Sequence, residues 1–144
     1  MVANGAESLK APLALAGVWL ATSSLSVLAV PVIIATMAPW HAAVRSLQQL
    51  SLWQTWISIA ACVLLMVISK RKYAQTQETW AQAAQLFVMG GLLTALVLHY
   101  GLLPQWVAHS SAWLKQAQML VFMLLHWLCA WMALRKIVQA RPPR

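Results

Sequence analysis

The stretch Ala117–Leu134, AQMLVFMLLHWLCAWMAL, decides the fold of this chain, and Arg135 and Lys136 follow it directly. As a helix its 18 residues span ~27 Å, close to the hydrocarbon thickness of a bilayer. The stretch has no permanently charged residue, but an ionisable side chain, His126, stands near its middle. Burying an imidazole without a hydrogen-bond partner is costly, so a histidine at this depth is a candidate functional residue.

Three further apolar stretches precede this one, at residues 11–37, 50–69 and 81–103. Of the 144 residues, 62% are hydrophobic and 8% are charged, which is too apolar for a soluble domain of this size. We therefore predict an all-α integral membrane protein, a four-helix bundle of up-down-up-down topology. The remaining segments are a cytoplasmic N-terminus (1–10), an outer connector (38–49), a cytoplasmic loop (70–80), a second outer connector (104–116) and a basic cytoplasmic tail (135–144).

The basic residues predict the orientation. With the N-terminus inside, the outer side has only Arg45 and Lys115. The inner side has Lys10, Lys70, Arg71, Lys72, Arg135, Lys136, Arg141 and Arg144. Since Lys and Arg are in excess on the cytoplasmic side of membrane proteins, we expect both termini in the cytoplasm. This distribution also accounts for the net charge of +8 without a nucleic acid partner.

Small residues recur on one face of each of the first three predicted helices. The faces are Ala14, Gly17, Ala21, Ser24, Leu28, Pro31 and Ala35; then Ser51, Thr55, Ser58, Cys62, Leu65 and Ser69; then Gly90, Gly91, Thr94 and Ala95. Small side chains let membrane helices approach closely, so we expect these faces to pack against other helices, within the bundle or in a partner.

Acidic residues are nearly absent. Glu7 and Glu78 are the only two, and both lie outside the predicted spans. Proton-coupled exporters commonly use a carboxylate within the bundle, and paired-carboxylate chemistry needs two neighbouring acids. The composition therefore argues against both classes.

Met37 and His41 suggest one metal site. They lie one helical turn apart if the helix continues through them, and a thioether with an imidazole suits copper. The alternative is that histidines near the membrane surface hydrogen-bond headgroups, water or backbone, since no HxxxH or HxH pair places two ligands on one element.

His126 and His99 suggest a haem site. Bis-histidine ligation needs two imidazoles at one depth, whereas His99 lies about six residues outward of its helix centre, an offset of ~9 Å. Ligation of haem or chlorophyll by His126 alone is a further alternative. The simpler interpretation is an interhelical hydrogen bond from His126 to Ser58, Thr55 or Thr94.

The cysteines and tryptophans have structural interpretations as well. Cys62 and Cys129 fall at similar predicted depth, where they could form a redox pair or act as small packing residues. Four of the nine tryptophans stand where interfacial anchors belong: Trp40, Trp80, Trp106 and Trp113. Four lie deeper and could face lipid, a partner subunit or a quinone pocket: Trp53, Trp56, Trp127 and Trp131.

Several short motifs together resemble a known family. They are Gly17-Val18-Trp19 with Val30-Pro31, His99-Tyr100-Gly101-Leu102-Leu103-Pro104, and Leu125-His126. With the length and the four-span layout, these motifs are similar to a bacterial family of four-helix membrane proteins of unassigned function, related to the eukaryotic transmembrane protein 205. The resemblance implies an integral membrane protein and supplies no reaction.

The absence of a recognisable catalytic set favours a non-enzymatic role. The leading hypothesis is a small accessory or structural subunit, embedded in the lipid bilayer of a bacterial inner membrane, that packs against a larger membrane complex or forms a homo-oligomer. The alternative is a protein that binds haem, copper or quinone, or transports a small solute, through His126, His99 and His41.

Overall fold

The computed structural model describes residues 9–37, 39–77, 79–108 and 113–140, and these residues are almost wholly helical. The elements are α2 (Lys10–Thr36), α3 (Trp40–Thr76), α4 (Thr79–Leu96), the π-helix η1 (Val97–Leu102), α5 (Leu103–Ala108) and α6 (Trp113–Gln139). Because α4, η1 and α5 follow one another without a break, they form a single rod. The chain thus has four helices long and apolar enough to cross a membrane, as the hydropathy pattern predicts.

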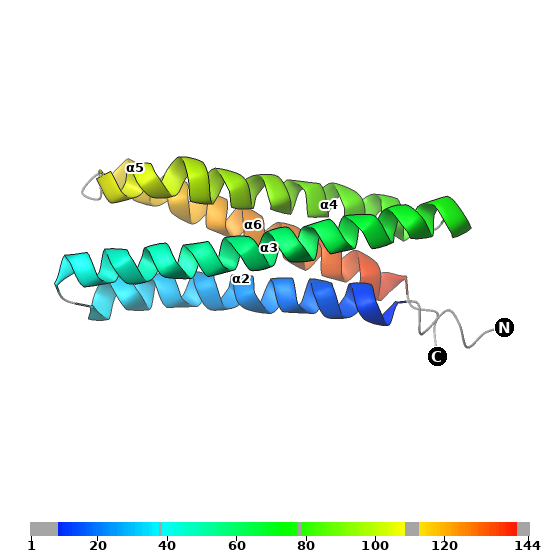
Figure 1. Cartoon of the computed structure of the whole chain (residues 1–144), viewed down its shortest axis with the longest axis horizontal. Coiled ribbons are helices and arrows are strands. Elements are labelled where there is room, and N and C mark those ends of the chain that lie inside the picture. Colours follow the sequence, from blue (N-terminus) through cyan, green and yellow to red (C-terminus); the bar gives the residue numbers. More distant parts are fainter. Residues whose placement is uncertain (1–8, 38, 78, 109–112, 141–144) are drawn as a thin grey trace.

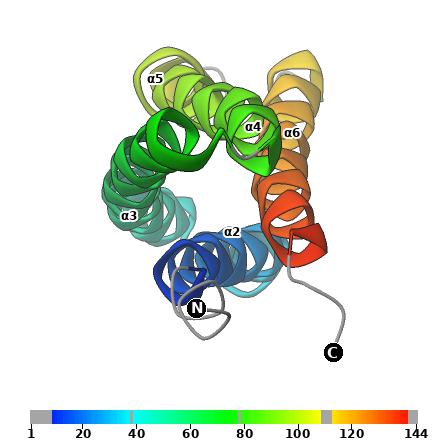
Figure 2. The same cartoon turned by 90° about the vertical axis from the view of Figure 1, so that its right-hand side faces the viewer.

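The four rods run alternately up and down and pack as a ring in chain order (Figures 1 and 2). Each rod packs against two neighbours: α2 on α3, α3 on α4, α4 on α6 and α6 on α2. The start of α2 and the end of α6 lie at the same end of the bundle (Figure 1). The predicted all-α up-down-up-down bundle is confirmed.

Helix α3 is longer than the sequence pattern predicts. The expected second helix covers residues 50–69, with a connector before it and a loop after it, but the structure continues α3 from Trp40 to Thr76. No proline or glycine interrupts this range, and its polar ends include several Gln, Lys and Arg residues, which are good helix formers. The helix ends at Gln77, whose φ of 51° is in the left-handed region.

The second expected connector, residues 104–116, is also largely helical, with α5 before the undescribed residues 109–112 and α6 after them. Pro104 directly follows the third apolar stretch, 81–103, and lies in the first turn of α5. A proline ring clashes with the carbonyl four residues earlier in an α-helix. The wider winding of η1 just before Pro104 relieves this clash, so the rod continues.

The small-residue face of the first helix does not point into the bundle. The buried residues of α2 are Pro12, Ala16, Trp19, Ser23 and Ser26, whereas Ala14, Ala21 and Leu28 of the expected face are exposed. The physical reason is Trp19, whose ring reaches past the neighbouring helices to Gly91 on the diagonally opposed α4. Because the large ring of Trp19 fills the bundle centre, the inner face of α2 is not the face with the small side chains.

The faces expected for the second and third helices are confirmed. Thr55, Ser58, Cys62, Leu65 and Ser69 of α3 are buried. Gly91 and Ala95 of α4 are buried as well. These small side chains let α3 and α4 approach the central ring of Trp19 and the imidazole of His126.

Candidate functional site

His126 lies at the centre of the bundle, and its side chain is 4% exposed. The indole Nε1–H of Trp19 donates to its Nε2 over 3.0 Å, and its Nδ1 lies 2.9 Å from the carbonyl oxygen of Gly91. The rings of Trp19 and His126 meet edge to face at 5.5 Å between centroids. One imidazole therefore joins α6 to both α2 and α4.

These two partners determine where the imidazole proton resides. An indole N–H is only a donor, so Nε2 of His126 accepts. A carbonyl oxygen is only an acceptor, so Nδ1 carries hydrogen and donates to Gly91. The ring in this site is the neutral tautomer with its proton on Nδ1, because a proton on Nε2 would face the Trp19 N–H.

Two hydroxyl groups complete the surroundings of the imidazole. Ser58 Oγ is 3.1 Å from Nε2, and Thr94 Oγ1 is 3.2 Å from Nδ1. The expected interhelical hydrogen bonds of His126 to Ser58 and Thr94 are thus confirmed, whereas Thr55 lines a neighbouring cavity. With Ser58 on α3, the imidazole contacts all three other rods of the bundle.

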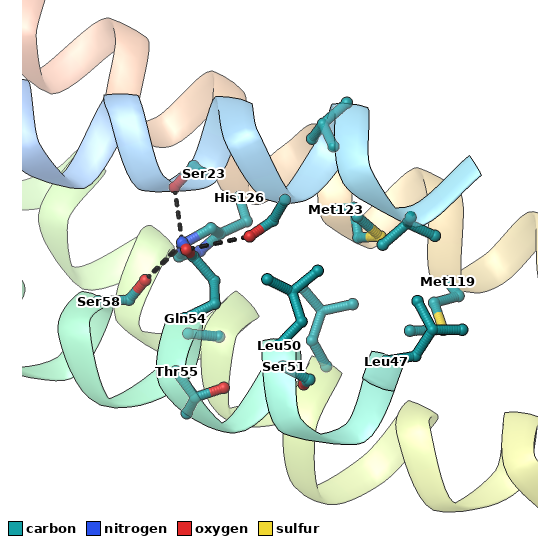
Figure 3. Close-up of a pocket in the computed structure, with 15 residues that line it drawn as sticks. Ser23, Leu47, Leu50, Ser51, Gln54, Thr55, Ser58, Met119, Met123 and His126 are labelled. Atoms are coloured by element: carbon teal, nitrogen blue, oxygen red, sulfur yellow. Dashed lines mark hydrogen bonds between the residues drawn. The ribbon is translucent and has the colours of Figure 1, made fainter. Parts of the chain in front are cut away.

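Gln54 extends the polar cluster between α2 and α3 (Figure 3). Its amide nitrogen donates to Ser23 Oγ over 3.0 Å and to Ser58 Oγ over 3.1 Å. Its carbonyl oxygen accepts from Ser26 Oγ over 3.1 Å. We call Trp19, Ser23, Ser26, Gln54, Ser58, Thr94 and His126 the central network.

Gly91 is required by the packing of this network. A Cβ added at Gly91 would overlap the six-membered ring of Trp19. At the neighbouring Gly90 a Cβ would make an ordinary contact, 3.4 Å from Cys129 Sγ. Of these two adjacent glycines, only Gly91 therefore needs to lack a side chain.

A cavity of about 60 Å³ lies beside the network and is lined by residues of all four rods. Figure 3 shows Gln54 and Ser58 at one end and Leu47, Met119 and Met123 toward the other. The polar atoms at this cavity are turned toward one another, so its surface is almost entirely hydrocarbon. A second cavity, of about 140 Å³, adjoins the first.

The residues considered for metal and haem do not come together in this structure. Met37 follows the last residue of α2 in an extended conformation, and α3 begins at Trp40, so the continuous helix that would align Met37 with His41 is not formed. His99 lies in η1, where its Nδ1 is 3.2 Å from Ser51 Oγ and its ring meets Tyr100 edge to face. Among residues 9–37, 39–77, 79–108 and 113–140, no three His, Cys, Asp or Glu side chains are grouped to hold a metal ion.

Cys62 and Cys129 are free thiols. Cys62 belongs to the buried core, and Cys129 packs against that core near Gly90. This is the arrangement of packing residues.

Sequence reasoning found His126, Ser58 and Thr94 but missed Trp19 and Gln54. Both carry a signal: each is a large polar-tipped side chain at the middle of an apolar helix, where an N–H group needs a partner. The carbonyl of Gly91 has no side-chain signal at all. It is available because the absent side chain exposes the backbone of α4.

Comparisons of the chain with family models, with curated proteins and with solved structures find no match.

Proposed function

We propose that this protein is a small accessory subunit of a bacterial inner-membrane complex, with both termini in the cytoplasm, and that it acts by packing against a larger membrane protein. The distribution of Lys and Arg supports this orientation. Lys10, the Lys70–Lys72 run and Arg135 belong to helix ends at one end of the bundle (Figure 1).

The observation that carries the proposal is a pair of outward tryptophans at mid-bundle depth. Trp53 and Trp56 of α3 are 68% and 59% exposed. Trp56 is two residues from Ser58, which contacts His126, so it lies within ~3 Å of the depth of the central network. Tryptophan prefers the membrane surface to the hydrocarbon centre, where its N–H has no water to bond.

Neither of these two indole N–H groups has a hydrogen-bond partner among the residues that the structure describes. In contrast, Trp127 on α6 donates to Ser24 over 2.8 Å. A second protein chain that covers Trp53 and Trp56 would supply acceptors and bury two large rings, the residue type enriched in protein interfaces.

The interior of the bundle supports a non-catalytic role. Both ring nitrogens of His126 and the amide of Gln54 are engaged with other helices. The central network therefore acts within the bundle by fixing which helices meet and in which register.

Site-specific photo-crosslinking in intact membranes tests the proposal. A photoreactive phenylalanine analogue replaces Trp53 or Trp56 in the full chain, and a matched control replaces Leu86, which is 71% exposed on α4. We expect one discrete heterologous adduct from positions 53 and 56 and none from position 86. Adducts to a second copy of this chain would show self-assembly and refute the accessory role. Adducts to lipid alone at all three positions would also refute the accessory role.

Haem binding through His126 does not fit the geometry. An axial ligand presents a free ring nitrogen to iron, but Nε2 of His126 already accepts from Trp19 and Nδ1 donates to Gly91. The adjoining cavities, of about 60 Å³ and about 140 Å³, are also smaller together than sites of cofactor size, which are typically ~300 Å³ or more. The hydrogen bonds instead account for this histidine completely.

A further inference from the structure

The two cavities beside the central network form one elongated apolar space. Both are lined by Val30 of α2, Leu47 of α3, and Met119 and Met123 of α6. One cavity has a volume of about 60 Å³ and the other of about 140 Å³. The space therefore runs along the second half of α2 and the first halves of α3 and α6, from Gln54 toward the start of α6.

The outer cavity has its mouth between α2 and α6. Ile34 and Leu120 line it, and both side chains are also exposed on the surface of the bundle. A residue that lines a cavity and is also exposed on the surface marks the place where the cavity opens to the surface. Since these helices are apolar enough to cross a membrane, the medium at this mouth is the lipid interior.

The walls of the space favour a hydrocarbon occupant. The polar groups at its inner end satisfy one another, as Gln54 does with Ser23, Ser26 and Ser58. A water molecule needs two to four polar partners, and an engineered apolar cavity of ~150 Å³ stays dry and takes up benzene or xenon. The outer cavity, about 140 Å³, is close to that size, and its lining is mainly apolar apart from Trp106 and Gln116.

Methionines form the wall contributed by α6. Met119 and Met123 are one helical turn apart and each lines both cavities. Their unbranched, rotatable side chains adapt to a flexible guest better than Leu or Ile would.

We propose that this space binds one acyl chain of a membrane phospholipid, which enters from the bilayer between α2 and α6. The methyl end of the chain points toward Gln54, and the ester end lies near Gln116, in the first turn of α6. This inference does not depend on the accessory role proposed above, because that role concerns the opposite, outward side of α3.

Photolabelling of the unmodified protein tests the site directly. The full chain is reconstituted in vesicles of phosphatidylethanolamine and phosphatidylglycerol that contain a phosphatidylcholine with a diazirine in one acyl chain. We expect adducts on Met119, Met123 or Val30 in addition to outward residues such as Leu86. Labelling confined to outward residues would overturn the proposal, as would labelling of Met119 and Met123 by an isoprenoid diazirine probe but not by the acyl probe.

Filling the space provides the second test. Met123→Phe should narrow it, whereas Met89→Phe, on the exposed side of α4, is the matched control. Delipidated protein in mild detergent is titrated with dioleoyl phosphatidylglycerol and analysed by native mass spectrometry. We expect one retained lipid per chain in the parent and the control, with about tenfold weaker retention in Met123→Phe, equivalent to ~1.4 kcal/mol.

Equal lipid retention by Met123→Phe and Met89→Phe would refute a site at this place. Circular dichroism of both variants establishes that they are folded. If Met123→Phe does not fold, the labelling pattern of the unmodified protein decides the matter.

Discussion

Replacing Gly91 by alanine is the sharpest test of the central network, because the added methyl group would overlap the ring of Trp19. Overpacking a filled interior costs about 1–3 kcal/mol. A displaced Trp19 also loses its hydrogen bond to His126, and interhelical hydrogen bonds in membranes contribute on average about 0.6 kcal/mol. Alanine recovers up to about 1 kcal/mol of helix propensity. The expected net loss for Gly91→Ala is therefore about 0.6–2.6 kcal/mol of unfolding free energy.

Gly90→Ala is the matched control, because its Cβ would make only an ordinary contact with Cys129. We expect it to be neutral or slightly stabilising, since the propensity gain remains and no overlap occurs. Both variants are unfolded by sodium dodecyl sulfate titration from mild detergent and followed by circular dichroism. Equal stability of the two variants, or a larger loss in Gly90→Ala, would refute the packing of Trp19 against α4.

Three further predictions concern the hydrogen bonds. Trp19→Phe keeps an aromatic ring but removes the donor, so the same titration should show a loss of about 0.5–1.5 kcal/mol; no loss would mean that the bond to His126 contributes nothing. His126→Leu should lower the unfolding free energy more than Gln54→Leu does. Without the imidazole, the Trp19 N–H is buried and unpaired, whereas without the Gln54 amide, Ser23 Oγ still donates to the backbone carbonyl of Trp19 over 2.8 Å. The reverse order would contradict this reasoning. Nitrogen-15 NMR of labelled histidine should find His126 protonated on Nδ1 and bare on Nε2, and the opposite tautomer would rule out the observed partners.

The fold class was predictable because it depends on length and hydropathy alone. Four long apolar stretches in a chain with 8% charged residues leave few alternatives to a helical membrane bundle. Helix ends were less predictable. Hydropathy falls where α3 leaves its apolar section, but Gln, Lys and Arg continue the helix as readily as Leu does.

The site was only partly predictable, for a reason visible at Trp19. The small-residue faces of α3 and α4 point into the bundle, whereas the small-residue face of α2 points outward. Helix packing requires that a large side chain meet a small one, and small-residue spacing treats each helix separately. The sequence of α2 alone does not indicate that Gly91 of α4 lies opposite Trp19.

The sequence by itself determined that this chain forms four apolar helices and that His126 needs a partner at mid-depth, because burial of a polar ring is costly wherever it occurs. Only the tertiary structure decided which partners it has. The indole of Trp19 and the carbonyl of Gly91 are far from His126 along the chain, and they converge on it only when the helices close into a ring. That convergence places an obligate donor on one nitrogen and an obligate acceptor on the other, which assigns the histidine to the framework of the bundle.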